Sequence, residues 1–313
     1  MSKKIRIILT GLLMLGIVLA GVYVVKNKET KQLDAATRAQ LGGQYIQLKN
    51  GVVHYELQGD KSQPTVVLVH GFSSPLYVFD PTVDFLLKQR FRVLRFDLFG
   101  RGFSDRIEAS DYGIDLYVEQ LHDLLIALNI SAPVNIVGLS MGGAIVTHFT
   151  NKYPEMIDKV ALVAPLFETP ARPEVTLVKT PGLGEYLGKV VLVPKFIDGV
   201  TETVFDPRSF PDWSEKFSPQ TEYRGFSDAM VQTARFLSGK NFKTEYESLG
   251  ALKKPVLLFW GRQDSVIPFS DSERVRQAVP QSQFHAIEQA GHLPHYEQPK
   301  QVNPILLSFL QTP

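Results

Sequence analysis

The feature that most constrains the fold is the stretch VNIVGLSMGGAIVTHF at residues 134–149. An apolar run of strand length leads into Ser140, which stands between Gly138 and Gly142, and a helical pattern follows at once. Glycine on both sides indicates a backbone turn too sharp to leave room for side chains. The stretch therefore predicts a strand and a helix joined almost without a loop, with the Ser140 hydroxyl held out at the joint.

Apolar runs and helical patterns alternate along the rest of the chain. Continuous apolar runs are typical of strands that are covered on both faces, and they occur at TVVLVHG (65–71), KVALVAP (159–165) and PVLLFWG (255–261), while FRVLRFDLFG (91–100) predicts a further strand. Between them, DLYVEQLHDLLIALNI places Leu121, Leu124, Leu125 and Leu128 on one face of a helix. This order predicts an α/β fold with a mostly parallel, doubly wound sheet.

A hairpin is predicted where the folded body begins, in YIQLKNGVVHYELQG (45–59). Val53, Tyr55 and Leu57 alternate with polar residues, as in a half-buried strand. Asn50–Gly51 predicts a tight turn in which both residues have positive φ.

The N-terminus is predicted to lie outside the globular body. Residues 7–25 are apolar apart from Thr10 and small glycines, and 19 residues of helix would span roughly 28 Å, close to the hydrocarbon thickness of a bilayer. A cleaved signal peptide ending near Ala20 is the alternative, but the apolar run continues past that residue. We expect an uncleaved, single-pass anchor at residues 1–25, with the body on the periplasmic or extracytoplasmic side.

Three further divisions follow from composition. Residues 26–42 are charged and polar and predict a linker, helical around LDAATRAQL, that would reach at most about 60 Å if extended. Residues 43–165 and 252–313 carry the α/β pattern, whereas residues 166–251 are rich in proline and aromatic residues. The latter range predicts an inserted cap over the carboxyl edge of the sheet, with a long surface excursion as the alternative.

Composition also excludes several classes of function. The chain has 313 residues, no cysteine and a net charge of +1. Disulfides, thiolate metal sites and cysteine nucleophiles are excluded. The near-neutral charge, without a basic run, argues against nucleic acid as a partner.

The order of these motifs resembles the α/β-hydrolase fold superfamily across roughly residues 43–313. The resemblance rests on HGF, DLFGRGFSD, GLSMGG, WGRQD and AGHLPHYEQP, each after or between the predicted strands in the order of that superfamily. Within it, the chain looks most like bacterial lipases and esterases related to membrane-anchored monoacylglycerol lipases. The resemblance implies a serine hydrolase that needs no metal or organic cofactor.

Such an enzyme needs a serine, an acid and a histidine in that chain order. Ser140, Asp264 and His292 satisfy this order, with Asp264 directly after a predicted strand and His292 in a loop bounded by glycine and proline. A serine hydroxyl is a poor nucleophile unless a base takes its proton. His295 is the rival base, and Asp271 and Glu168 are the rival acids.

Two backbone N–H groups are predicted to form the oxyanion hole: that of Met141, at the start of the helix, and that of Phe72, after HG. We expect esters or lipids with apolar acyl chains as substrates, bound by cap aromatics such as Phe196, Phe205, Phe210, Trp213 and Phe217. The alternatives are a carbon–carbon bond hydrolase or a perhydrolase with the same triad, or a non-catalytic ligand-sensing protein.

Overall fold

A computed structural model describes residues 2–108, 112–130, 133–169 and 180–312. One sheet of eight strands forms the centre, in the order β1-β2-β4-β3-β5-β6-β7-β8. From β4 through β8 neighbouring strands are parallel, and only β1–β2 and β2–β4 are antiparallel. The strands are β1 (Gln44–Gln47), β2 (Val52–Gln58), β3 (Thr65–Val69), β4 (Arg92–Phe96), β5 (Val134–Leu139), β6 (Ile157–Val163), β7 (Val256–Gly261) and β8 (Gln283–Ile287). The predicted mostly parallel α/β sheet is confirmed.

Helices cover both faces of this sheet, because every second strand residue points to the opposite face. Val67 and Val69 face one hydrophobic cluster, which includes side chains from α4 (Ile114–Ala127), α5 (Met141–Lys152), α11 (Lys243–Ala251) and α12 (Asp271–Ala278). Val66 and Leu68 face the other cluster, with α3 (Asp80–Lys88), α13 (Pro294–Glu297) and α14 (Pro299–Gln311). Two packed layers therefore hold the sheet rigid, which fixes the positions of the strand ends.

The predicted hairpin is present, but its turn is not the one expected. Gln47 pairs with Val52, so the turn has four residues, and the Leu48 N–H donates to the Gly51 carbonyl at 2.9 Å. Neither Asn50 nor Gly51 has positive φ. Glycine at position 51 is instead explained by close packing, since a Cβ there would lie 2.9 Å from Ile107 Cγ2.

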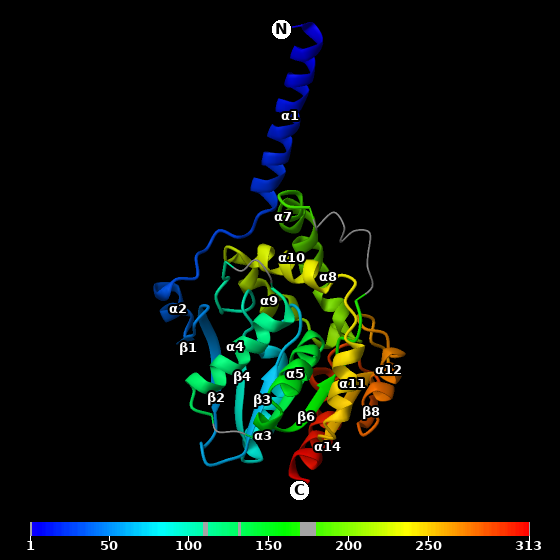
Figure 1. Ribbon diagram of the computed structural model, residues 1–313. Helices are drawn as coiled ribbons and strands as arrows, with labels where there is room; N and C mark the ends of the chain where they lie inside the picture. Colours follow the sequence, from blue (N-terminus) through cyan, green and yellow to red (C-terminus); the bar gives the residue numbers. More distant parts are fainter. Residues whose placement is uncertain (1, 109–111, 131–132, 170–179, 313) are drawn as a thin grey trace.

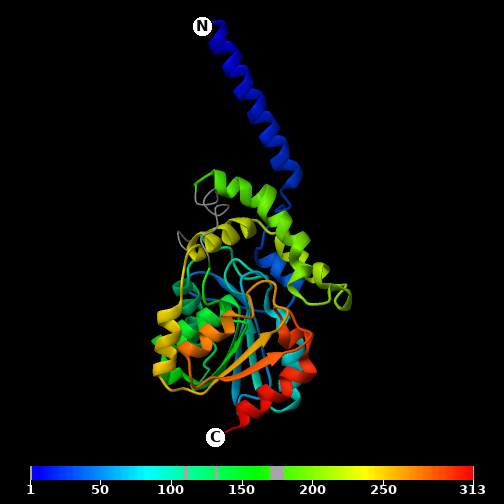
Figure 2. The same cartoon turned by 90° about the vertical axis from the view of Figure 1, so that its right-hand side faces the viewer.

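The segment between β6 and β7 lies over one end of the sheet (Figures 1 and 2). Residues 170–179 of the predicted cap lie outside the described residues. The described part contains α7 (Leu183–Leu187), η3 (Gly188–Leu192), α8 (Val193–Gly199), η4 (Val200–Thr203), η5 (Pro207–Ser209), α9 (Trp213–Phe217), η6 (Ser218–Glu222) and α10 (Phe226–Leu237). Helix α11 also falls in the predicted range, but it packs with α5 and α12 in the core layer.

The N-terminal apolar stretch forms a single helix, α1 (Lys3–Lys26), with a mean hydropathy of 2.5 and no buried residue. Figures 1 and 2 show α1 projecting from the end of the body where α7 lies, away from the C-terminus. The predicted helix in the linker is present as α2 (Ala35–Leu41).

Candidate active site

Ser140 lies at the sharp turn between β5 and α5. Its backbone has φ 55° and ψ −120°, a combination that a residue with a side chain adopts only when its surroundings impose it. The Ser140 N–H donates to the Val163 carbonyl at 2.9 Å, and its own carbonyl accepts from the N–H groups of Gly143 and Leu166, both at 2.9 Å. Strand β6, the loop that follows it and helix α5 therefore hold this turn in place.

The glycines around Ser140 are explained by close packing. A Cβ on Gly142 would lie 2.3 Å from the Val69 carbonyl oxygen, and a Cβ on Gly138 would lie 2.5 Å from the Gly142 carbonyl oxygen. No side chain fits at either position without moving backbone. This tight contact allows β5 to pass directly into α5, as the sequence predicts.

Asp264 and His292 are joined by a hydrogen bond. Asp264 follows β7 and His292 follows β8, and His292 Nδ1 lies 2.9 Å from Asp264 Oδ2. The other carboxylate oxygen, Oδ1, accepts from the backbone N–H groups of Val266 and Ile267 at 2.8 and 2.9 Å. Because β5, β7 and β8 are parallel, the three predicted triad residues all lie at the same edge of the sheet.

The loop that carries His292 is fixed by two contacts that the sequence analysis missed. The carboxylate of Glu297 accepts from the backbone N–H groups of Gly291 and Leu293, each at 3.0 Å, and from Phe205 in the cap at 2.6 Å. The His292 N–H donates to the Thr203 carbonyl, also in the cap, at 2.9 Å. The position of Glu297 in the motif AGHLPHYEQP is the only sequence signal for this role.

The rival residues have other partners. His295 is buried against Phe79, with 4.8 Å between ring centroids, and burial lowers its pKa to about 3. Glu168 and Asp271 both pair with Arg274, and Glu168 also accepts from Asn241 Nδ2 at 2.8 Å. No described contact joins either rival acid to a histidine.

Phe72 and Met141, the predicted oxyanion donors, line the same pocket as Ser140. A Cβ on Gly71 would lie 3.1 Å from Ser140 Cβ, so the peptide that carries the Phe72 N–H passes directly by the serine. Met141 is the first residue of α5, and an N–H group in the first turn has no acceptor within its own helix. Both N–H groups are therefore close to the Ser140 side chain.

Arg101 fixes the loop that carries Phe72, and the sequence analysis did not identify it. Its side chain is fully buried, and its Nε donates to the Phe72 carbonyl at 2.8 Å. Nη1 donates to Tyr117 Oη at 2.8 Å and Nη2 to Thr233 Oγ1 of α10 at 2.9 Å. One guanidinium thus connects the Phe72 loop, the α4 layer and the cap.

His70 braces the same loop from the other side. Its Nδ1 donates to the Gly71 carbonyl at 2.8 Å, and its Nε2 accepts from the Leu98 N–H at 2.9 Å. This arrangement requires a neutral imidazole, and burial lowers the pKa of His70 to about 4.

A pocket of about 620 Å³ opens beside Ser140. Its apolar lining comes from Phe72, Met141, Leu166, Ala234, Leu237, Val266, Ile267 and Pro268. The ion-paired side chains of Glu168, Asp271 and Arg274, together with Thr169, Ser238 and Ser265, supply its polar lining. The pocket therefore offers both an apolar surface and a group of hydrogen-bonding side chains near one serine.

The aromatic residues expected to bind an acyl chain do not line this pocket. Trp213 and Phe217 are fully buried, and Phe196 lies between Phe72 and Phe217, at 6.1 and 5.9 Å between centroids. Phe210 packs on Tyr296, and Phe205 is exposed. Trp213, Phe210 and Phe196 pack on aromatic residues of the core, which joins the cap to the core and leaves the pocket beside Ser140 with an aliphatic lining.

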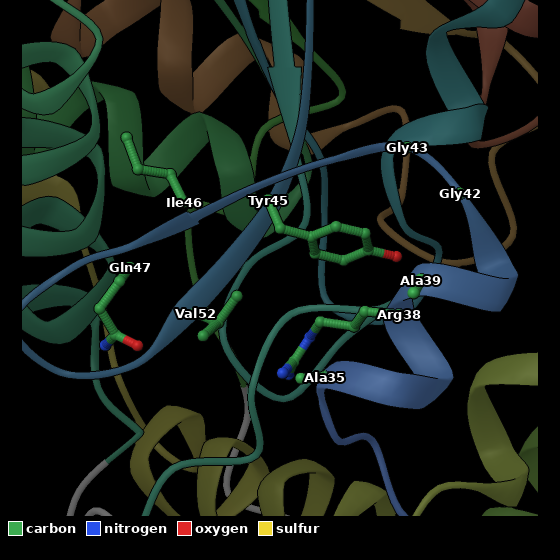
Figure 3. A pocket seen from close by; sticks show the side chains of 9 residues that line it. All are labelled: Ala35, Arg38, Ala39, Gly42, Gly43, Tyr45, Ile46, Gln47 and Val52. Atoms are coloured by element: carbon green, nitrogen blue, oxygen red, sulfur yellow. The ribbon is translucent and has the colours of Figure 1, made fainter.

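A second hollow, of about 440 Å³, lies between α2 and the β1–β2 hairpin. There the Arg38 guanidinium lies over the Tyr45 ring, 5.7 Å from its centroid (Figure 3). None of the predicted catalytic residues lines it.

Known proteins share the sequence pattern and the fold of this chain. The sequence pattern of the α/β hydrolase fold matches residues 64–299. Monoacylglycerol lipase ABHD6 of Mus musculus is 24% identical over 259 residues, which cover 79% of this chain and 76% of that protein. The uncharacterized hydrolase YugF of Bacillus subtilis is 24% identical over 83% of this chain and 94% of its own length.

Solved structures share the fold. An esterase from Thermogutta terrifontis superposes with a TM-score of 0.72 at 23% identity, covering 86% of this chain and 98% of the esterase. The 2-hydroxy-6-oxo-6-phenylhexa-2,4-dienoate hydrolase of a Rhodococcus strain superposes with a TM-score of 0.70 at 25% identity, covering 87% of this chain and all of that one.

Proposed function

The chain belongs to the α/β-hydrolase fold family, and we propose that it is a serine hydrolase that cleaves carboxylic esters of apolar acyl chains. One observation carries the proposal most directly. The hydrogen bond of 2.9 Å between His292 and Asp264 lies at the same sheet edge as Ser140, which occupies a strained turn beside a mixed apolar and polar pocket.

In the proposed mechanism, His292 takes the proton of Ser140 through Nε2, because Nδ1 is bound to Asp264. Ser140 attacks the ester carbonyl, and the N–H groups of Met141 and Phe72 stabilise the tetrahedral oxyanion. Protonated His292 then donates to the leaving alcohol, which leaves an acyl-enzyme. Water activated by His292 releases the acid, while Asp264 stays ionised and holds the imidazole in one tautomer.

We propose monoacylglycerols, or esters of similar size, as substrates. The aliphatic side chains of Leu166, Leu237 and Ile267 suit an acyl chain, and the paired Glu168 and Arg274 suit an alcohol that carries further hydroxyl groups. The relative ABHD6 is named a monoacylglycerol lipase, which supports the same substrate class.

The experiment is a series of methyl esters and 1-monoacylglycerols with matched acyl chains. We expect kcat/KM to rise by up to about fourfold per added methylene while the chain stays in the pocket, from about 0.8 kcal/mol per buried CH₂. At equal chain length, the glycerol ester should be preferred. Strict preference for acetyl esters would contradict the lipase proposal, and turnover of aromatic diketones alone would indicate a carbon–carbon bond hydrolase.

We also propose that α1 is an uncleaved membrane anchor and that the catalytic body lies on the extracytoplasmic side. Its 24 residues are long and apolar enough to cross a bilayer, and it leaves the body beside the cap (Figure 1). This placement would bring the pocket close to a lipid surface, where esters of apolar acids concentrate.

A further inference from the structure

The segment that follows α1 is docked on the cap, in contrast to the free tether that its composition suggests. The Lys31 N–H donates to the Glu222 carbonyl at 2.9 Å, and the Arg224 N–H donates to the Lys31 carbonyl at 3.0 Å. Glu29, two residues earlier, is only 6% exposed. A charged residue in a polar linker has no reason to be buried unless it has specific partners.

Glu29 accepts hydrogen bonds from N–H groups at the start of α10, and its Oε2 also lies 3.9 Å from Nζ of Lys189 in η3. Oε2 accepts from Gly225 N–H at 2.8 Å, and Oε1 accepts from Ser227 N–H at 2.6 Å. Gly225 is the N-cap of α10 and Ser227 lies in its first turn, where N–H groups have no acceptor within the helix. A carboxylate at this end is also favoured by the helix dipole. Glu29 therefore fixes the start of α10 from outside the cap's own sequence.

The other end of α10 forms part of the pocket beside Ser140. Ala234, Leu237 and Ser238, at the end of this helix, line the pocket. Thr233 accepts from Arg101, whose Nε holds the Phe72 carbonyl. The helix has 12 residues, and its continuous backbone hydrogen bonds connect its start to its end. A shift at its start therefore moves the pocket wall and the support of the Phe72 loop.

We propose that Glu29 is a positioning residue for the active site: the juxtamembrane segment, by capping α10, sets the pocket wall and the Phe72 N–H in their working positions. The inference rests on the proposed function and adds to it a dependence of catalysis on the chain beside the membrane. The contact of α1 itself with the cap agrees with this, because the Tyr186 hydroxyl donates to the Leu19 carbonyl at 3.0 Å.

The experiment compares E29Q and E29A with the unmodified full-length chain in detergent micelles. A fluorophosphonate probe counts competent sites, and kcat and KM are measured per labelled site on a medium-chain ester. E29Q keeps the size of the side chain and one acceptor, but its amide N–H₂ faces a backbone donor. The control is E222Q, because the Glu222 carboxylate pairs with Lys31 on the same segment and both side chains are exposed.

We expect kcat/KM per labelled site to fall by about tenfold in E29Q and further in E29A, because a displaced pocket wall and Phe72 loop stabilise the transition state less well. E222Q should stay within about twofold. The preference for longer acyl chains should also weaken in the Glu29 variants, since α10 supplies pocket wall.

Two results would overturn the inference alone. One is an active wild type together with Glu29 variants in which both the number of labelled sites and kcat/KM per site are unchanged. The other is a reduced number of labelled sites with unchanged kinetics at each, which would assign Glu29 to stability only. A wild type that neither reacts with the probe nor hydrolyses esters would instead refute the proposed function, and this inference with it.

Discussion

Replacement of Arg101 by methionine tests how the cap and the Phe72 loop are held together. Methionine is apolar and fills much of the same volume, but it donates no hydrogen bond. The carbonyls of Phe72 and Phe99 lose their guanidinium donor, at 2.8 and 3.3 Å in the wild type. Tyr117 and Thr233 lose the same donor but remain within 3.0 Å of each other.

The size of the effect follows from these contacts. A buried acceptor left without a donor costs about 1–3 kcal/mol, so two carbonyls give about 2–6 kcal/mol. The variant also avoids the desolvation penalty of a buried guanidinium, which offsets part of this loss of stability. We therefore expect R101M to lower the free energy of unfolding by about 2–4 kcal/mol, a large share of the 5–15 kcal/mol typical of a folded domain.

Urea unfolding in detergent micelles measures this change, followed by the fluorescence of Trp213 and Trp260, which are both fully buried. R208M is the control, because the Arg208 side chain is 91% exposed. Under folding conditions, R101M should lower kcat by a larger factor than it changes KM. The upper limit of the decrease in kcat is about 10²–10³-fold, the loss measured when an oxyanion donor is removed. A change in unfolding free energy below about 0.5 kcal/mol would refute the bracing role.

Three further predictions concern the turn, pH and the anchor. Gly142→Ala should abolish ester hydrolysis, because its Cβ would lie 2.3 Å from the Val69 carbonyl oxygen; activity within tenfold of wild type would contradict this packing. In the unfolded chain, His70 and His295 bind a proton with the ordinary pKa of about 6.5. In the folded chain, burial lowers the pKa of His70 to about 4 and that of His295 to about 3, so both stay neutral at pH 5 to 7. The free energy of unfolding should therefore fall as pH drops below about 6.5, by up to about 1.4 kcal/mol per pH unit for each histidine. H295F should remove the contribution of His295 to the pH dependence of the unfolding free energy, measured by urea unfolding at pH 5 to 7. An unchanged dependence on pH would contradict this assignment to His295. The full-length chain should stay in the membrane pellet after carbonate washing, and release into the supernatant would exclude α1 as a spanning anchor.

Features encoded by local pattern were predictable from the sequence. Strands β3 and β7 are covered on both faces, so they read as the unbroken apolar runs TVVLV and VLLFW. The placement of Ser140, Asp264 and His292 after β5, β7 and β8 was equally predictable, because each lies in the turn or loop that follows a strand pattern.

Features that depend on distant contacts were not predictable. Glu29 lies in the polar sequence KNKETKQ, and its partners are backbone N–H groups almost 200 residues away, at Gly225 and Ser227, which carry no sequence signal. The Asn50–Gly51 pair predicts a positive-φ turn, but the reason for glycine at position 51 is the approach of Ile107. Composition likewise does not show whether an aromatic residue of the cap packs internally or lines a pocket. Trp213 and Phe217 are fully buried and do not line the pocket beside Ser140.

The most direct test of the proposed triad is hydrolysis of a medium-chain ester by full-length S140A, H292A and H295A, with fluorophosphonate labelling in parallel. S140A and H292A should lose about 10⁴-fold or more in turnover, and S140A should not be labelled at all. H295A should keep turnover close to that of the wild type, because His295 packs against Phe79 and not against Asp264. Retention of a tenth or more of the activity in S140A or H292A would contradict the assignment of these residues.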